Sequence, residues 1–255
     1  MKLENNSRCN FPPDLPGSKW GDHTTVFFQR HLITCGGLTD YSNYTGTSTN
    51  ITCLKWNKNS SQWMDGPNMR NDKWFYGAFA VNTSLGVWFI DPSNGVSYLL
   101  KDIKKDMEPG PHTNTRRWYS CVIKAFGDSI IISGGQDLYN NDLDSVELYD
   151  HHMNFSRNLP PLLFTRHSHA CSSVGTLVVV SGGTSGSYSD DLILDTVEVL
   201  DLMSSSGWKL FPKLPRRLYY GVMVNLRGKL VYIGGQYIPN PPETDPPINM
   251  SNQHE

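Results

Sequence analysis

Short apolar runs recur along the chain at a nearly constant interval, and four of them end in two adjacent glycines. The pairs are Gly36-Gly37, Gly134-Gly135, Gly182-Gly183 and Gly234-Gly235. Successive pairs lie 98, 48 and 52 residues apart, so the first interval spans two periods of 49. A fifth apolar run, 86–90, lies where this period predicts it, with Asp91-Pro92 in place of the glycines. Repeats of about 50 residues with glycine-punctuated strands are typical of β-propeller blades.

Other features keep the same period and predict a unit of four antiparallel strands. A basic residue, followed in most repeats by an aromatic ring, precedes the apolar run. These basic residues, the openers, are Lys19, Lys73, Arg117, Arg166 and Arg217. First strands are expected over 23–28, 77–81, 121–126, 169–174 and 221–226, and third strands over 52–56, 95–99, 145–149 and 196–200. The fourth strand of each unit ends in prolines, which suit an edge strand because proline has no N–H to donate.

The two ends of the pattern predict how the ring of blades closes. Residues 9–16 resemble the fourth strand expected at 208–215, whereas no third strand follows the apolar strands at 220–233. We expect 9–16 to complete the C-terminal blade, because closure removes exposed strand edges. The prediction is one all-β domain over 9–238, a propeller of about five four-stranded blades, with an incomplete six-bladed ring as the alternative. The predicted repeats are 19–70, 73–112, 117–162, 166–215 and 217–238 with 9–16, followed by a disordered, proline-rich tail at 239–255.

With these landmarks in one register, the chain resembles the kelch-repeat family. The best match is 117–215, with Ser-Gly-Gly and then Val-Glu-Leu-Tyr-Asp in one repeat and Val-Glu-Val-Leu-Asp in the next. The second repeat departs from the pattern because it lacks Gly-Gly and a Trp, and Phe155 replaces the Trp of the third. The resemblance implies a propeller whose loops on one face bind a partner. Many kelch proteins are ubiquitin-ligase adaptors or bind actin, but those adaptors carry a BTB domain that this chain lacks, so neither role is carried over.

Charge and motifs narrow the classes of function. The net charge is −2, from 22 Lys and Arg against 24 Asp and Glu, so no basic excess favours a nucleic-acid partner. No apolar stretch approaches the roughly 18 residues that span a bilayer, so no membrane insertion is expected. No phosphate loop or His-Glu-x-x-His motif occurs, and no catalytic residue or cofactor is predicted. His167-Ser168-His169 would project two imidazoles from one strand face, but no third ligand is apparent, and no metal is predicted.

The openers and the loop tyrosines are the candidate binding residues. Lys19, Lys73, Arg117, Arg166 and Arg217 should recur at one level of the ring, either capping their loops and stacking on neighbouring rings, or forming a basic rim for an acidic peptide. Tyrosines in the loops after the glycines offer contact area with a polar tip. These are Tyr41, Tyr139 and Tyr188, with Tyr44 and Tyr237 in similar loops. The predicted function is a non-catalytic protein-binding module. The alternatives are an enzyme acting on a sugar or other small molecule in the central channel, and an extracellular adhesion or matrix module.

Five cysteines occur, and two of them depart from their repeats together. Cys35 ends the second strand of its repeat and Cys53 lies in the third, which pairs with it. A bridge between them is expected if the register fits, and would stabilise by about 3 kcal/mol. Two unrelated buried thiols are the alternative.

Asparagines in Asn-x-Ser/Thr sequons exceed the roughly three expected by chance. They are Asn5, Asn43, Asn50, Asn59, Asn82, Asn154 and Asn249, and the five from Asn43 to Asn154 are the candidate glycosylation sites. The first nine residues have no apolar core, so we expect no signal peptide there. An intact chain is therefore expected in the cytoplasm. If the true N-terminus is missing, the sequons and the bridge favour an extracellular location.

Overall fold

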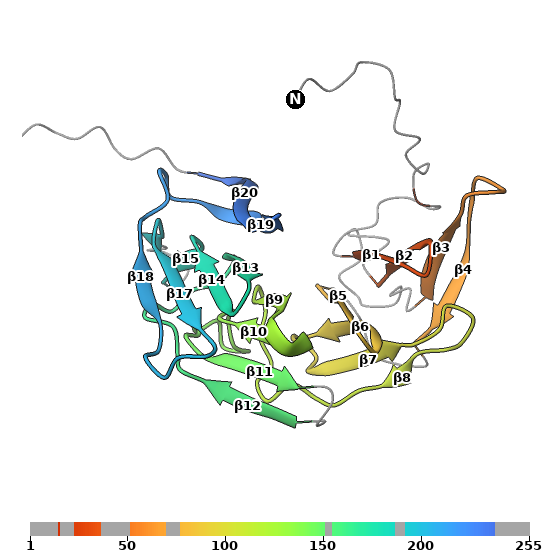
Figure 1. Ribbon diagram of the computed structural model, residues 1–255, viewed down its shortest axis with the longest axis horizontal. Helices are drawn as coiled ribbons and strands as arrows, with labels where there is room; N and C mark the ends of the chain where they lie inside the picture. Colours follow the sequence, from red (N-terminus) through yellow and green to blue (C-terminus); the bar gives the residue numbers. More distant parts are fainter. Residues whose placement is uncertain are drawn as a thin grey trace, which may run out of the picture.

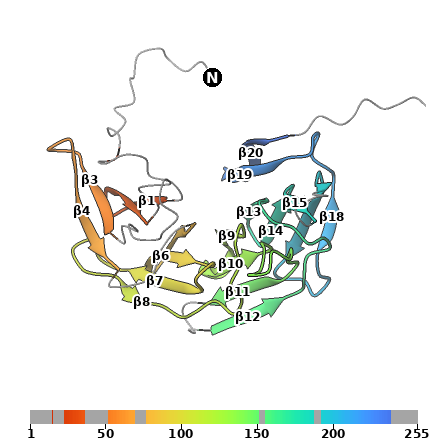
Figure 2. The ribbon, with the colours of Figure 1, turned by 180° about the vertical axis from the view of Figure 1, so that it is seen from behind.

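The chain folds into an arc of β-sheets that stand side by side. The computed structural model describes residues 15, 23–36, 52–69, 77–150, 155–186 and 192–237. These residues form twenty strands and one short 3₁₀ helix, Phe126–Asp128. The arc runs from the sheet of β1–β4 at one end to that of β19–β20 at the other (Figure 1), and the view from behind shows the same order (Figure 2). The predicted all-β, blade-by-blade architecture is confirmed.

Four sheets have four antiparallel strands that follow one another from the inside of the arc outward. Blade 1 contains β1 (Thr24–Phe28), β2 (His31–Cys35), β3 (Thr52–Asn57) and β4 (Gln62–Asn68). Blade 2 contains β5 (Phe79–Thr83), β6 (Gly86–Asp91), β7 (Val96–Leu100) and β8 (Glu108–Pro109). Blade 3 contains β9 (Cys121–Lys124), β10 (Ile130–Ser133), β11 (Val146–Asp150) and β12 (Phe155–Leu159). Blade 4 contains β13 (Ala170–Val174), β14 (Leu177–Ser181), β17 (Val197–Asp201) and β18 (Lys209–Phe211).

Two shorter sheets complete the described strands. β15 (Thr184–Ser185) and β16 (Leu192–Ile193) form a hairpin in the loop after β14. Blade 5 contains β19 (Tyr219–Leu226) and β20 (Lys229–Gln236), paired with each other. The segment expected to close the ring, 9–16, lies outside the described residues except for Leu15, and the tail at 239–255 lies wholly outside them.

In blades 2, 3 and 4, the continuous apolar runs are explained by burial of both faces of the second strand. In β10, Ile130 and Ile132 pack in a cluster with Val81 and Trp88 of blade 2. The residue between them, Ile131, packs instead in the cluster shared with blade 4. Side chains alternate between the two faces of a strand, so a strand that lies between two other sheets needs apolar residues at every position. The core is therefore a series of layers between neighbouring blades.

The glycine pairs lie where two backbones approach each other closely. A Cβ atom added to Gly134 would be 2.4 Å from the carbonyl oxygen of Arg166, which opens the next blade. One added to Gly135 would be 2.5 Å from the carbonyl oxygen of Trp118 in the same blade. Both glycines also have positive φ, of 54° and 96°. The pair in blade 3 therefore lies at a crowded bend beside the next blade.

Blade 2 makes the corresponding bend without glycines. The buried carboxylate of Asp91 accepts hydrogen bonds from the backbone N–H of Ser93 (3.0 Å) and of Asn94 (3.2 Å) and from the Asn94 side-chain amide (2.8 Å). The backbone N–H of Gly95 closes the turn on the Asp91 carbonyl at 2.9 Å. A side chain that satisfies the turn's donors thus replaces the glycine pair at the position that the period predicted.

Two disulfides join the strands, one expected and one not. Cys35 and Cys53 are opposite each other in β2 and β3, with Cα atoms 4.1 Å apart, and form the predicted bridge. Cys121 of β9 is bonded to Cys171 of β13, across 50 residues of sequence. This second bridge joins the innermost strands of blades 3 and 4, whereas the first lies within one blade.

Candidate functional site

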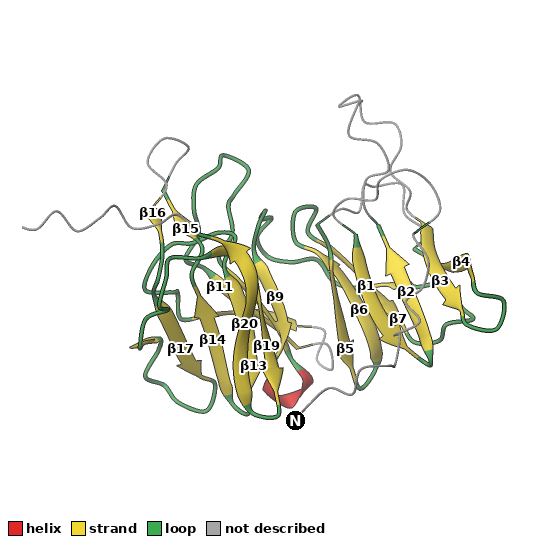
Figure 3. Ribbon diagram, turned by 90° about the horizontal axis from the view of Figure 1, so that it is seen from above, coloured by secondary structure: helices red, strands yellow, loops and turns green. Residues whose placement is uncertain are grey.

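The long loops gather at one end of the strands. Figure 3 shows β15, β16 and the long loops at one end and the 3₁₀ helix at the other. We call the first end the loop face. It comprises residues 111–120, 134–145, 160–169, 182–186, 192–196 and 212–220. We call the other end, with the hairpin turns at 126–129, 175–176 and 227–228, the turn face. Blades 3 and 4 each put the opener, the glycine pair and the link to the next blade on the loop face.

Arg117 lies in the interior of blade 3, with 1% of its surface exposed. Its guanidinium donates to the carboxylate of Glu147 at 2.5 Å and to the carbonyl oxygens of Gly134 and Ser145, both at 2.9 Å. Burial lowers the pKa of Arg117, and the charge of Glu147 opposes that shift. The Arg117 side chain therefore joins the start of blade 3 to the residue after its second strand and to the residue before its third strand.

Blade 4 repeats this arrangement one period later. Arg166 is fully buried, pairs with Glu198 and donates to the carbonyl oxygen of Gly182 at 2.7 Å. Each glutamate also accepts backbone N–H bonds from the loop that enters its blade, as Glu198 does from Leu163 at 2.6 Å. An arginine and a glutamate thus fix each loop from inside.

The predicted basic rim is therefore wrong for Arg117 and Arg166. Both guanidiniums are buried, and their charge is compensated by glutamates within the blade, so neither is presented to a partner. Arg117 and Arg166 match the alternative interpretation, in which an opener caps its own loop. Arg217 is exposed on the loop face, and Lys19 and Lys73 lie outside the described residues.

The second residue after Arg117 and after Arg166, and the third residue after Arg217, adopt a left-handed backbone conformation. These residues are Tyr119, Ser168 and Tyr220, with φ of 52°, 53° and 56°. Their backbones are linked from blade to blade, because Ser168 donates to the Tyr119 carbonyl and Tyr220 donates to the Ser168 carbonyl, each at 2.9 Å. This chain of hydrogen bonds compensates for a conformation that non-glycine residues rarely adopt. It leaves the rings of Tyr119 and Tyr220 exposed, with centroids 6.5 Å apart.

Beneath these rings lies a cavity of about 230 Å³, which we call the inner pocket. Its lining comprises Tyr119, Ser120, Ser168, His169, Tyr220 and Gly221, from the innermost strands of blades 3, 4 and 5 and the residues just before them. The His169 ring contacts the Ser133 hydroxyl through Nε2 at 2.9 Å. Burial, and then the positive charges of Arg166, His167 and Arg117, lower the pKa of His169 well below its usual value, so the ring is neutral at physiological pH.

Another loop of the loop face displays two large side chains to solvent. Tyr139 is 84% exposed and its neighbour Leu138 is 57% exposed. The loop is held by Asp137, whose carboxylate accepts from the backbone N–H of Tyr139 at 2.8 Å and from that of Asn141 at 2.9 Å. Since hydrogen bonds fix the loop, the exposed residues are presented on a formed surface.

His167 and His169 do not share one strand face, contrary to expectation. The left-handed conformation of Ser168 separates them, and both precede β13. The Nδ1 atom of His167 is 2.8 Å from Asp142, and its Nε2 atom is 2.7 Å from the Thr184 hydroxyl. No group of three or more His, Cys, Asp or Glu side chains that could hold a metal occurs among the described residues.

The Asp142–His167–Thr184 set resembles a catalytic triad in its residue types but differs from one in geometry. The Thr184 oxygen is also 3.2 Å from Nδ1, the nitrogen that faces Asp142. In a catalytic triad the hydroxyl oxygen lies in line with the Nε2 lone pair and therefore far from Nδ1. The Thr184 oxygen is close to both ring nitrogens, so it lies beside the ring. In this position the hydroxyl is not aligned to give its proton to Nε2. Thr184 is also buried. The set joins the loop of blade 3 to that of blade 4.

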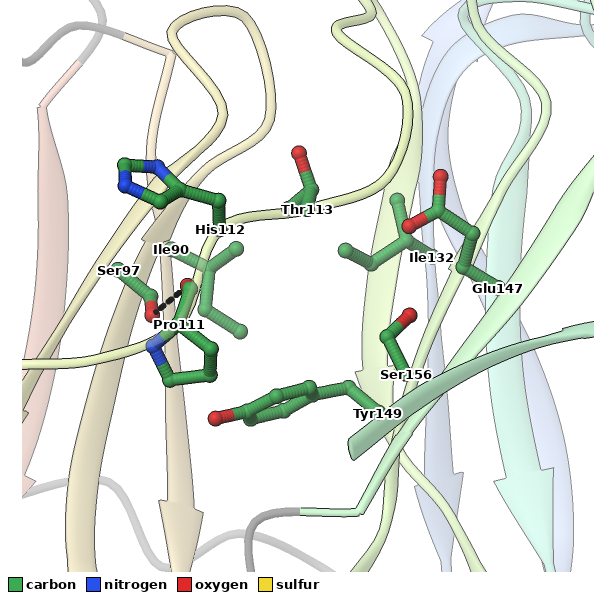
Figure 4. A pocket seen from close by; sticks show the side chains of 9 residues that line it. All are labelled: Ile90, Ser97, Pro111, His112, Thr113, Ile132, Glu147, Tyr149 and Ser156. Carbon is green, nitrogen blue, oxygen red and sulfur yellow. Dashed lines mark hydrogen bonds between the residues drawn. The ribbon is translucent and has the colours of Figure 1, made fainter. Parts of the chain in front are cut away.

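A second cavity lies between blades 2 and 3 and is lined by Glu147 and Tyr149 with His112 and Ser156 (Figure 4). Its volume is about 10 Å³, which is room for roughly one water molecule. The Glu147 carboxylate is already bonded to Arg117 and to the backbone N–H groups of Asn114 and Thr115. Burial, and then the charge of Asp150, raise the pKa of Tyr149. This cavity has no room for a substrate.

The remaining candidate residues are partly placed. Tyr139 is exposed on the loop face, whereas Tyr41 and Tyr188 lie outside the described residues. Among the sequons, Asn59 and Asn82 are exposed, and Asn43, Asn50 and Asn154 lie outside the described residues. Sequence reasoning missed the inner pocket, although Tyr119 and Ser168 share one position, the second after their openers. Within the described residues, no helix is both long and apolar enough to cross a membrane.

Comparisons with known proteins agree with this geometry. The model of the Kelch motif matches residues 165–212, which span blade 4 from its opener to its fourth strand. No curated protein matches the sequence. Among 194 matching chains of solved structures, one of YjhT has a TM-score of 0.71 and 12% sequence identity over 88% of this chain and 80% of its own. At 12% identity, this similarity is evidence for a shared fold alone. The motif in blade 4 and the fold of the whole arc support a kelch-type β-propeller.

Proposed function

We propose that this propeller is a non-catalytic protein-interaction module that binds its partner through the loop face. The observation that carries the proposal is the display of Leu138 and Tyr139 on a loop fixed by Asp137, on the loop face that also exposes the rings of Tyr119 and Tyr220. Aromatic and apolar side chains on a formed surface are typical anchors of protein interfaces. The kelch fold supports a role in protein interaction in general.

The partner that fits this face best carries an acidic segment. Arg216 lies over the ring of Tyr237 at 5.1 Å, and the neighbouring Arg217 is exposed. Arginine binds carboxylates through two parallel hydrogen bonds and stacks on aromatic rings. Positive charge next to exposed tyrosines therefore favours an acidic peptide, although the groups that would bind it differ from the buried openers.

The proposal is tested by placing a photoreactive phenylalanine analogue at Tyr139, with Phe126 as the matched control. Phe126 is an exposed aromatic residue on the turn face, 53% accessible. We expect a discrete protein to cross-link at position 139 and not at 126 when the protein is recovered from its native source. Equal cross-linking at the two positions, or none at 139, would contradict the proposal.

A location in an oxidising compartment is the second part of the proposal. Two disulfides are favoured in extracellular and secretory environments, and the exposed Asn59 and Asn82 sequons are accessible to glycosylation. The test is the intact mass of protein from its native source after alkylation without reduction, with and without enzymatic removal of glycans. Alkylated Cys35, Cys53, Cys121 and Cys171 with no glycan shift would overturn this part.

A further inference from the structure

Blade 5 has an outer edge that no described strand covers. In blades 1 to 4 the second strand pairs with a third, as β14 does with β17, whereas β20 pairs among the described residues with β19 alone (Figure 1). β20 is eight residues long and contains no proline, whereas the outermost strands of blades 2 and 4, β8 and β18, have two and three residues. A long strand edge without proline is open to pairing with another strand.

β20 carries apolar side chains on both of its faces. Leu230 and Tyr232 pack in the cluster that blade 5 shares with blade 4. On the other face Val231 and Ile233 are exposed, and so is Val222, the residue of β19 that is opposite Ile233. The second strands of blades 2, 3 and 4 are apolar in the same way but are buried. β20 therefore has the side chains of a covered strand and is accessible to solvent.

Blade 4 provides an apolar surface for a strand added to β20. Third strands of neighbouring blades share a core cluster, as β11 and β17 do, so an added third strand of blade 5 would pack on β17. Val197 and Val199 of β17 lie on the face of blade 4 that is turned to blade 5. Phe211 and Lys209 are opposite them in β18 and share that face. Phe211 is 63% exposed, so this surface is uncovered.

Exposed charges near β20 are mostly positive. Residues 192–237 contain six Lys and Arg against three Asp and Glu, and two of the acids are already in ion pairs, Glu198 with Arg166 and Asp195 with Lys213. Cations lie at both ends of the edge, because Lys229 begins β20, and Arg217 lies two residues before the residue that pairs with the end of β20. The exposed basic residues are Lys209, Arg216, Arg217, Arg227 and Lys229. A partner with acidic residues matches this charge.

We propose that the outer edge of β20 binds an extended segment of a partner protein, which takes the place of a third strand in blade 5. The backbone of the segment pairs with β20, and alternate side chains, which are apolar, pack on Val199 and Phe211. Acidic residues on both sides of the segment meet Lys229 and Arg217. This surface is separate from the loop face, so the inference does not rest on the proposed function.

The first test is amide hydrogen exchange in β20 of the full chain, followed by NMR. Alternate amides of β20 point away from β19, and in the free protein we expect them to exchange rapidly because they are unpaired. Slow exchange of these amides in the free protein would overturn the proposal. If it does not depend on protein concentration, the chain's own residues, such as 9–16, cover the edge, and if it strengthens with concentration, a second copy does.

The second test adds the peptide acetyl-Glu-Glu-Val-Thr-Val-Thr-Val-Glu-Glu-amide, which we call the strand probe. We expect it to slow exchange of the same alternate amides. A probe with proline at the central valine should bind at least about tenfold more weakly, because proline cannot donate to the ladder. Unchanged exchange in β20, or equal binding of the proline probe, would overturn pairing at this edge. A probe with Gln for each Glu should bind about tenfold more weakly at low ionic strength, and equal binding would overturn the acidic character of the partner.

A variant of blade 4 tests the surface on which the segment packs. Phe211→Ala should weaken the strand probe about fivefold, because the ring is covered in the complex. The melting temperature should change little, since most of the ring is exposed in the free protein. The matched control is Phe126→Ala, which removes an exposed ring on the turn face. Equal effects of the two variants on the probe would show that the segment does not pack on blade 4.

The two proposed binding surfaces can be told apart by experiment. Cross-linking at Tyr139 without any response of β20 to the strand probe would refute the edge site alone. Slowed exchange in β20 without cross-linking at Tyr139 would refute only the proposed role of the loop face.

Discussion

Arg166 and Glu198 form an ion pair in the interior of blade 4, and neither side chain is exposed to solvent. The pair of Arg117 and Glu147 occupies the equivalent place in blade 3. In both blades the arginine also donates to the carbonyl oxygen of the first glycine of the pair. In blades 3 and 4, the opener and the first glycine of the pair are therefore in direct contact.

The first prediction concerns the loss of one member of this pair. Arg166→Ala should lower the free energy of unfolding by about 3–5 kcal/mol, because it leaves the Glu198 carboxylate buried without its partner. Chemical denaturation followed by circular dichroism measures the change. Arg217→Ala is the matched control, because that opener is exposed and its replacement should cost about 0.5 kcal/mol or less. Similar costs for the two variants would show that Arg166 does not support the blade.

Much of the fold could be predicted because its signals repeat. The apolar run of β10 and the pair Gly134-Gly135 have counterparts in the next blade, and the period located β6 although Asp91-Pro92 stands in place of the glycines. The Cys35–Cys53 bridge was also accessible, because antiparallel pairing of neighbouring strands fixes which residues are opposite each other.

What the sequence did not reveal depends on the direction of side chains and on packing between blades. A basic residue before a strand can point outward or inward, and only the Glu that follows Arg117 and Arg166 in the third strand indicates that both point inward. The Cys121–Cys171 bridge depends on the approach of strands from different sheets, for which strand pairing gives no register. The inner pocket requires three blades at once, so no single repeat contains it.

The second prediction isolates the contact between blades at a glycine. Gly182→Ala should destabilise the protein by more than about 3 kcal/mol, because the new Cβ would be 2.2 Å from the Leu218 carbonyl oxygen. Gly175→Ala is a close control, since Gly175 has a similar φ of 59° but no heavy atom within 4 Å of its added Cβ. The control should cost only the backbone strain, about 1 kcal/mol. Equal losses would mean that the approach of the next blade does not constrain Gly182.

The third prediction concerns the bridge between blades 3 and 4. Replacing Cys121 and Cys171 together with serine should lower the free energy of unfolding by about 4 kcal/mol, as expected for a closed loop of this length. Chemical denaturation measures the change. The double replacement of Cys35 and Cys53 in blade 1 is the control and should lower stability by about 3 kcal/mol, because it closes a shorter loop. A larger loss in that control than in the Cys121 and Cys171 variant would contradict the dependence on loop length.

The fourth prediction is a dependence of stability on pH that arises from His169. Burial and neighbouring positive charges lower the pKa of His169 in the folded protein, whereas in the unfolded chain it titrates near its ordinary value of 6.5. Below that pH the unfolded state binds a proton that the folded state does not, so stability is present above about pH 6.5 and is lost as the pH falls.

Between pH 6 and pH 5 the loss should approach about 1.4 kcal/mol per pH unit, which corresponds to one proton. Denaturation curves of the wild type and of His169→Gln at several pH values in this range measure it, and the variant should lack this part of the slope. His167→Gln is the neighbouring control, because the His167 ring contacts the Asp142 carboxylate and is a separate side chain from the buried His169 ring. If the slope between pH 6 and pH 5 is the same in the wild type and in His169→Gln, the folded protein does not exclude a proton from the buried ring.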